Sequence, residues 1–353
     1  KGKKIFINNK SRKLKNIAPY SFVKTMRAGI IVLGSLLARF GKAKVSLPGG
    51  CAIGTRPVDI HLFGLKKLGA KIKIKNGYIL AEAKKGLRGS KIRFPSISVG
   101  ATENVIIAAC LAKGTTYLKN CACEPEIKNL KNFLKNMGAK ITWLKRREIK
   151  IVGIKKFKQV SHSIMFDRIE AGTFIIAAAL AGKKIKICGL DVKILKTEIK
   201  ILKKMGVSLK ISKNEIQVLK SKNIKPIFIK TEPYPGFPTD LQAQIMVLMT
   251  RAKGISRIRE NIFENRFMHV PELNRMGAKI KIFGNSSTVS GPQDLNGAEV
   301  MATDLRASVS LVLAGLIAND RTIINRVYHL DRGYENLEKK LRKCKAKISR
   351  IQY

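Results

Sequence analysis

The stretch Leu65-Lys-Lys-Leu-Gly-Ala-Lys-Ile-Lys-Ile74 decides the fold, because versions of it recur along the chain. Three further copies begin at Leu134, Leu202 and Leu273, and a worn copy begins at Leu341. The glycines of the four full copies recur about every 70 residues, at Gly69, Gly138, Gly206 and Gly277, and Lys345 takes the place of the glycine in the fifth. Spacing this constant indicates an internal structural repeat.

Each copy predicts the same local structure. A helix ends at the glycine, which suits a residue with positive φ, and an alternating strand such as Lys71–Ile74 follows. A turn and a second strand come next, as at Gly77–Leu80, which gives a βαβαββ unit. A second helix upstream in each copy is apolar nearly all round and should therefore be buried. These helices are expected at Val23–Phe40, Ala101–Leu111, Glu170–Ala181, Asp240–Thr250 and Arg306–Ala318.

The repeat also predicts the domain organisation. A chain of 353 residues is long enough for two α/β domains built from such repeats, and it holds five copies and the tail of a sixth. We place the domains at residues 1–163 and 164–353, and we expect a ligand in the cleft between them. Residues 2–8 look like the last strand of a further copy, so about 60 residues of a first repeat are expected upstream.

The composition limits the class of protein. The formal net charge is +47, but the lysines are spread along the whole chain and are not interleaved with aromatic residues. This pattern favours a drift of surface positions to lysine over a nucleic-acid partner, and a basic binding protein stays open as an alternative. No apolar run is long enough to span a membrane. The six cysteines and four histidines show no metal-binding spacing, so we expect no metal or cofactor, and reduced cysteines in the cytoplasm.

The segment Pro48-Gly-Gly-Cys51 predicts a surface loop, because Pro and Gly interrupt helices and strands. A cysteine is unusual in such a loop, since thiols are normally buried. Cys51 is therefore a candidate nucleophile or general acid, and Arg56 would favour its thiolate and bind an anionic substrate. A surface turn with an incidental cysteine is the alternative at this point.

Five other segments place polar or charged residues at helix starts or in loops. Ser98–Thr102 and Lys24–Arg27 precede or open buried helices, Phe237–Asp240 brings a carboxylate, and Asp304–Arg306 and Asp331–Glu335 bring arginines. Helix N-termini and arginines suit a phosphorylated or carboxylated substrate, with Asp240 as the general base. Each segment also has a structural explanation: a solvated first turn, an N-cap at Ser98 or Asp240, or surface ion pairs of the arginines.

With these segments in this order, the chain resembles the UDP-N-acetylglucosamine 1-carboxyvinyltransferase family of enolpyruvyl transferases. That family has two inside-out α/β domains, each with threefold βαβαββ repeats. It transfers the enolpyruvyl group of phosphoenolpyruvate to the 3-hydroxyl of UDP-N-acetylglucosamine and releases phosphate, the first committed step of peptidoglycan synthesis. The resemblance is carried by Ala18–Arg27, Leu47–Cys51, Arg56–His61, Ser98–Thr102, Phe237–Asp240, Phe263–His269, Ala302–Arg306 and Asp331–Glu335.

The resemblance implies roles for individual residues. Cys51 would be the proton donor and the target of fosfomycin, Asp240 the base near the sugar hydroxyl, and Arg332 a third catalytic group. The implied substrate-binding residues are Arg27, Arg56, Pro57, Val58, Asp59, Ile60, Ser98, Val99, Gly100, Ile262 and Arg306. The family's Lys-Asn pair, which contacts phosphoenolpyruvate, would belong to the missing first repeat.

The resemblance further implies a monomer in the cytoplasm, with the two small-molecule substrates as partners and neither nucleic acid nor membrane. Two alternatives remain open at this point. One is a transferase of the 5-enolpyruvylshikimate-3-phosphate synthase type, against which the Cys51 loop argues. The other is an inactive truncated copy that acts as a basic binding protein.

Overall fold

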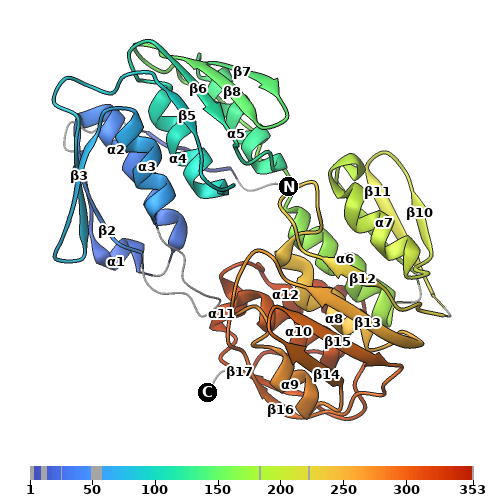
Figure 1. Cartoon of the computed structure of the whole chain (residues 1–353). Coiled ribbons are helices and arrows are strands. Elements are labelled where there is room, and N and C mark those ends of the chain that lie inside the picture. The colour runs from blue at the N-terminus through green and yellow to red at the C-terminus, as the bar shows by residue number, and fades with distance from the viewer. Residues whose placement is uncertain are drawn as a thin grey trace. The chain divides into compact units, whose positions relative to one another are not determined.

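The computed structural model describes residues 4–8, 14–24, 26–48, 58–182, 184–221 and 223–351. Within this part, the chain forms two compact units (Figure 1). Unit 1 ends at Ser163 and unit 2 begins at Ile164. Cys51, Arg56 and Pro57, with most of the loop predicted around them, lie outside the described residues.

Unit 1 contains two repeats, each with a mixed sheet. The first has β1 (Ile17–Ala18), α1 (Tyr20–Val23), η1 (Arg27–Ile31), α2 (Val32–Phe40), β2 (Lys42–Ser46), α3 (Asp59–Lys67), β3 (Lys71–Lys75) and β4 (Tyr78–Glu82). The second has β5 (Lys91–Arg93), α4 (Val99–Ala109), β6 (Thr115–Lys119), α5 (Pro125–Asn136), β7 (Lys140–Lys145) and β8 (Glu148–Val152). The strand orders β1-β2-β4-β3 and β5-β6-β8-β7 match, with one parallel pair and two antiparallel pairs in each sheet.

Unit 2 contains three repeats. The first has α6 (Arg168–Ala181), β9 (Lys184–Cys188), η2 (Val192–Leu195), α7 (Lys196–Lys204), β10 (Leu209–Ile211) and β11 (Glu215–Leu219). The second has β12 (Phe228–Lys230), η3 (Thr239–Leu241), α8 (Gln242–Met249), β13 (Gly254–Arg259), α9 (Val270–Arg275), β14 (Lys279–Phe283) and β15 (Ser286–Gly291). The third has β16 (Glu299–Met301), α10 (Leu305–Gly315), β17 (Ile323–Asn325), α11 (Tyr328–Asp331) and α12 (Leu337–Lys343). The second sheet, β12-β13-β15-β14, repeats the strand order of unit 1.

The repeated glycines end their helices as predicted. Gly69, Gly138, Gly206 and Gly277 have φ values of 95°, 98°, 84° and 92°. In this region a side chain is strained, so glycine is the favoured residue. Lys345 has φ 68° in the worn copy, so the turn is kept there without its glycine.

Three predictions about individual elements are wrong. The described residues 4–8 form no strand, and residues 346–350 form none either. Ile5, Phe6 and Ile7 are more than 80% exposed, and a strand needs a neighbouring chain to satisfy its backbone groups. The helix expected at Val23–Phe40 is divided, because the chain is extended at Met26 and continues as the 3₁₀ helix η1 before α2 begins.

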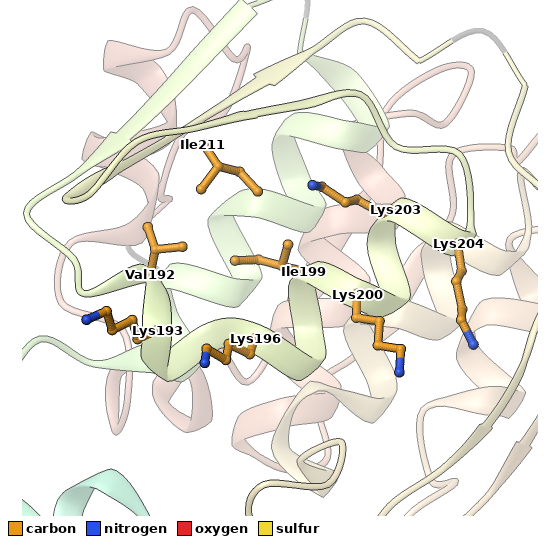
Figure 2. A pocket seen from close by; sticks show the side chains of 8 residues that line it. All are labelled: Val192, Lys193, Lys196, Ile199, Lys200, Lys203, Lys204 and Ile211. Carbon is orange, nitrogen blue, oxygen red and sulfur yellow. The ribbon is translucent and has the colours of Figure 1, made fainter.

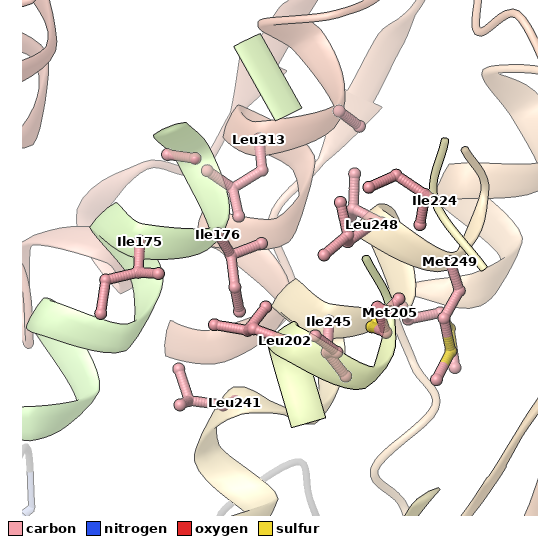
Figure 3. Packing of buried hydrophobic residues seen from close by; sticks show 14 of the residues in the cluster. Ile175, Ile176, Leu202, Met205, Ile224, Leu241, Ile245, Leu248, Met249 and Leu313 are labelled. Carbon is pink, nitrogen blue, oxygen red and sulfur yellow. The ribbon is translucent and has the colours of Figure 1, made fainter. Parts of the chain in front are cut away.

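The apolar helices are the core of each unit, as their composition predicts. Every residue of α8 is buried, and α8 contacts both α6 and α10. Figure 3 shows Ile175 and Ile176 of α6, Leu248 of α8 and Leu313 of α10 within this cluster. In unit 1, α4 has the same central position and contacts α2, α3 and α5. Each unit is therefore an α/β structure with helices inside.

Candidate functional site

Three aspartates precede or open the three central helices of unit 2, and one of them differs from the others. The carboxylates of Asp167 and Asp304 accept hydrogen bonds of 2.8 to 3.2 Å from backbone N–H groups in the first turns of α6 and α10. These are ordinary N-caps. Asp240 lies at the corresponding place before α8, but neither η3 nor α8 has a side-chain cap. The alternative explanation of Asp240 as an N-cap is therefore wrong.

The Asp240 carboxylate instead binds two arginines. Its Oδ1 lies 2.6 Å from Nη2 of Arg266, and its Oδ2 lies 3.2 Å from Nη2 of Arg306. The side chain of Arg266 is 3% exposed, that of Arg306 is 14% exposed and that of Asp240 is 38% exposed. The alternative that Arg306 forms only a surface ion pair is wrong, because its guanidinium is largely buried. The carboxylate reaches solvent while both of its cationic partners are held inside the unit.

Burial is the largest single influence on Arg306 and lowers its pKa, but the charge and hydrogen bond of Asp240, together with the nearby Tyr334 and Asp167, outweigh burial and raise that pKa. Arg306 therefore stays charged beside the carboxylate. Two fixed guanidinium groups and a partly exposed carboxylate make a site that is suited to anionic substrates and to proton transfer.

The buried hydroxyl of Tyr334 is a second hydrogen-bond partner of Arg306. The Tyr334 hydroxyl lies 2.9 Å from the Thr173 hydroxyl, and it accepts hydrogen bonds of 3.3 Å from Gln244 Nε2 and Arg306 Nη1. Burial raises the pKa of Tyr334, which keeps the phenol protonated. This network joins α6, α8 and α10, and Arg306 connects it to the Asp240 carboxylate.

Sequence reasoning did not assign roles to Arg266, Tyr334, Gln244 or Thr173. Arg266 and Tyr334 lie inside two of the segments that carry the resemblance, Phe263–His269 and Asp331–Glu335. That signal could have identified those two residues. Gln244 and Thr173 lie inside apolar helices, and the local pattern gives no sign of their roles.

The loop that carries Ile262 is fixed next to Asp240. Glu260 accepts hydrogen bonds from the backbone N–H of Ile262 at 2.8 Å and from the hydroxyl of Thr239 at 3.0 Å. Arg332 caps the end of α11 and is exposed, and its neighbour Asp331 lies 2.6 Å from Arg350.

In unit 1 the structure brings two predicted binding segments together. Val58, Asp59 and Ile60 start α3, and Ser98, Val99 and Gly100 start α4. A Cβ atom added to Gly100 would lie 3.0 Å from Cε1 of His61, so the two segments touch through that imidazole.

The Ser98 side chain is an N-cap, because its hydroxyl accepts a 3.3 Å hydrogen bond from the backbone N–H of Ala101. The backbone of Arg27 lies in η1, at the start of the element that precedes α2. Of the unit 1 residues that the resemblance assigns to substrate binding, those within the described ranges lie at the starts of helical elements.

A separate cavity of about 560 Å³ lies between η2, α7 and β10 of unit 2 (Figure 2). Val192, Ile199 and Ile211 form its apolar floor. Its other lining residues are Lys193, Lys196, Lys200, Lys203 and Lys204. Lysine stems commonly cover apolar surface in this way while the charged ends stay in water. The cavity does not include Asp240 or its arginines.

Within the described ranges, no three His, Cys, Asp or Glu residues are grouped so that they could hold a metal ion. The helices of the described chain include none that is both long and apolar enough to span a membrane.

The chain is similar to known proteins over most of its length. Residues 1–341 match the family model described as EPSP synthase (3-phosphoshikimate 1-carboxyvinyltransferase). A UDP-N-acetylglucosamine 1-carboxyvinyltransferase from Pelagibacter ubique (strain HTCC1062) is 63% identical over 99% of this chain and 84% of its own length. The protein of the same name from Paramagnetospirillum magneticum (strain ATCC 700264 / AMB-1) is 52% identical over 95% of this chain and 78% of its own length.

Solved structures show the same fold. The enolpyruvyl transferase NikO from Streptomyces tendae has a TM-score of 0.85 at 25% identity, over 95% of this chain and 80% of its own. The EPSP synthase from Acinetobacter baumannii has a TM-score of 0.69 at 18% identity, over 90% of this chain and 77% of its own. From its family match and its identity to curated relatives, the chain belongs to the enolpyruvyl transferases and, within them, to the UDP-N-acetylglucosamine 1-carboxyvinyltransferase family.

Proposed function

We propose that this protein transfers the enolpyruvyl group of phosphoenolpyruvate to the 3-hydroxyl of UDP-N-acetylglucosamine and releases phosphate, as the first committed step of peptidoglycan synthesis. The observation that carries the proposal is the Asp240 carboxylate, bound by Arg266 and Arg306 where the other two repeats of unit 2 use an aspartate as an N-cap. The names of relatives up to 63% identical support the choice of substrates.

The reaction needs a base and fixed positive charge, and unit 2 offers both. Asp240 accepts the proton of the sugar hydroxyl as the hydroxyl oxygen attacks C2 of phosphoenolpyruvate. At the same time C3 of phosphoenolpyruvate gains a proton. The resulting tetrahedral intermediate loses a proton from C3 and expels phosphate, which restores the enol double bond. Arg306 and Arg332 bind the carboxylate and phosphate groups, whose anionic oxygens match the guanidinium donors.

Unit 1 binds the sugar nucleotide in this proposal. Val58–Ile60 and Ser98–Gly100 line the pocket in unit 1, and the first N–H groups of α4 suit phosphate oxygens. Ile262, in unit 2, keeps the substrate-binding role that the family resemblance implies. Arg27, Arg56 and Pro57 are the remaining substrate-binding residues of unit 1, and the two arginines bind anionic groups of the substrates. Cys51 supplies the proton that C3 gains. The protein acts as a monomer in the cytoplasm, where its thiols stay reduced.

The test measures phosphate release by the full chain with phosphoenolpyruvate and either UDP-N-acetylglucosamine or shikimate 3-phosphate. Phosphate should be released with UDP-N-acetylglucosamine and not with shikimate 3-phosphate. Release with shikimate 3-phosphate alone would overturn the substrate assignment, and no release with either would overturn the enzymatic function.

The Asp240 role is tested with matched asparagine variants. Asp240→Asn should lower kcat by about a thousandfold, because the amide cannot accept the proton. Asp167→Asn is the control, since asparagine is an equally good N-cap and the cap of α6 is kept. Equal activity of the two variants would remove Asp240 from the mechanism.

A further inference from the structure

Asn104, in the middle of α4, is fully buried and joins three elements of unit 1. Its Oδ1 accepts a 2.7 Å hydrogen bond from the backbone N–H of Gly34 in α2. Its Nδ2 donates to the carbonyl of Ile30 in η1 at 3.0 Å and lies 3.1 Å from Nδ1 of His61 in α3. One amide therefore links the elements that begin at Arg27, Asp59 and Val99.

The chemistry of these partners fixes the protonation of His61. A backbone N–H can only donate and a carbonyl can only accept, so the Asn104 amide has a single orientation. Its second Nδ2 proton then faces His61 Nδ1, which must accept. His61 is therefore a neutral imidazole with its proton on Nε2.

The surrounding packing leaves little room for these elements to shift. A Cβ atom added to Gly34 would lie 2.3 Å from Asn104 Oδ1, and one added to Gly64 would lie 2.4 Å from Cγ2 of Val105. Both α2 and α3 therefore meet α4 at glycines, next to the Asn104 hydrogen bonds. The Cε1–Nε2 edge of His61 lies against Gly100, at the start of α4.

We propose that Asn104 is a positioning residue for the sugar-nucleotide side of the active site, and that it acts through His61. Asn104 selects the His61 tautomer and holds the imidazole against Gly100, which sets the distance between the Val58–Ile60 and Ser98–Gly100 segments. This inference rests on the proposed function, because that function makes these two segments the nucleotide pocket. Neither residue touches the reacting atoms.

The first test is nitrogen NMR of the full chain labelled with ¹⁵N-histidine, with His61→Asn used to assign the His61 signals. At pH 7 the wild-type His61 should carry its proton on Nε2 alone. In Asn104→Asp a carboxylate oxygen faces Nδ1, so His61 should gain a second proton. A proton on Nδ1 in the wild type would overturn the tautomer and the proposal with it.

The second test separates KM from kcat. Asn104→Asp should raise the KM for UDP-N-acetylglucosamine by about tenfold or more and leave kcat within about threefold. The reason is that the variant weakens binding equally in the ground state and the transition state and does not alter the chemical step. Asn129→Asp is the matched control, since Asn129 Oδ1 lies 3.2 Å from Nε2 of His162 in another asparagine–histidine pair of unit 1. Equal effects of the two variants on KM would overturn the proposal.

A third pair of variants covers the case in which Asn104→Asp does not fold. His61→Asn keeps an acceptor near the position of Nδ1, whereas His61→Leu does not, so the leucine variant should bind UDP-N-acetylglucosamine at least fivefold more weakly by calorimetry. Equal binding by both would overturn the role of the Asn104 hydrogen bond. Calorimetry and NMR need no turnover, so a failure of the proposed reaction would be seen separately, as absent phosphate release.

Discussion

Asp240 Oδ1 lies 2.6 Å from Nη2 of Arg266, whose side chain is 3% exposed, and this pair joins the start of η3 to the loop before α9. An aspartate before a helix normally caps it, and Asp167 and Asp304 do so in the neighbouring repeats. Asp240 instead binds the two arginines Arg266 and Arg306. The comparison of repeats within one chain thus distinguishes the arginine-bound carboxylate of Asp240 from the two carboxylates that cap helices.

Replacing Arg266 by leucine should lower kcat/KM by at least a hundredfold, because the Asp240 carboxylate loses its shorter contact and its orientation. The free energy of unfolding should fall by about 1–3 kcal/mol, less than for a fully buried pair since Asp240 is partly exposed. Urea unfolding and steady-state kinetics measure the two effects.

Arg251→Leu is the matched control for this change. Arg251 lies 2.9 Å from Asp294, but these side chains are 40% and 85% exposed, so their ion pair should contribute less than about 1 kcal/mol. Loss of activity in Arg251→Leu equal to that in Arg266→Leu would show that any arginine loss disturbs unit 2, and that Arg266 has no special role.

The repeat and its turns could be predicted from the sequence because they follow local rules. A glycine with positive φ ends a helix wherever it occurs, and Gly69 or Gly277 needs no distant partner for that. The contacts of Asp240 could not be predicted in this way. Arg266 and Arg306 are 26 and 66 residues further along the chain, and only tertiary packing brings the loop before α9 and the start of α10 to the carboxylate.

The same reasoning explains the wrong predictions at the ends of the chain. The apolar run Ile5–Ile7 consists of strand-forming residues, but a strand forms only where a neighbouring strand pairs with its backbone groups. The sequence pattern indicates which secondary structure a segment could form, whereas a neighbouring strand decides whether a strand forms. The 3₁₀ helix η1 is a similar case, because the extended backbone at Met26 interrupts an apolar run that alone predicts one long helix.

Reversing Lys196 and Lys200 to glutamate tests the alternative of a basic binding protein. Both lysines line the cavity beside α7, and neither belongs to the Asp240 site. The double variant should leave kcat within about twofold while it weakens the salt-dependent retention of the chain on heparin. Reversal of Lys71 and Lys73 on the exposed side of β3 controls for the change in net charge. A loss of transferase activity confined to the first variant would instead make the cavity part of the site.

Glu103 should make unit 1 less stable as the pH rises. Burial, followed by the nearby Glu126 and Glu124 charges, raises the pKa of Glu103 from 4.5 to about 7. Between about pH 4.5 and 7 the folded unit keeps the Glu103 proton, whereas the unfolded chain loses it. The free energy of unfolding therefore falls as the pH rises through this range. Glu103→Gln should therefore stabilise unit 1 by about 1–3 kcal/mol at pH 8 and by little at pH 4.5.

Trp143 makes this measurement specific to unit 1, because it is the single tryptophan of the chain and lies in β7. Urea unfolding followed by its fluorescence reports that unit at each pH. Glu82→Gln, at the exposed end of β4, controls for the removal of one negative charge. A Glu103→Gln curve parallel to the wild-type curve across this range would contradict the prediction.

His269 should give unit 2 the opposite dependence on pH. Burial, with a smaller contribution from the Arg266 charge, lowers the pKa of His269 from 6.5 to about 4, and its Nε2 lies 3.2 Å from the sulfur of Met246. The unfolded chain therefore binds a proton that the folded unit excludes, and stability present above pH 6.5 is lost as the pH falls toward 4. The full shift corresponds to about 3 kcal/mol.

Hydrogen exchange of the α8 amides reports unit 2, and His269→Leu should flatten the loss of protection between pH 6.5 and 4 while Glu103→Gln does not. If the His269→Leu profile keeps the wild-type slope, His269 is not the group that destabilises unit 2 in acid.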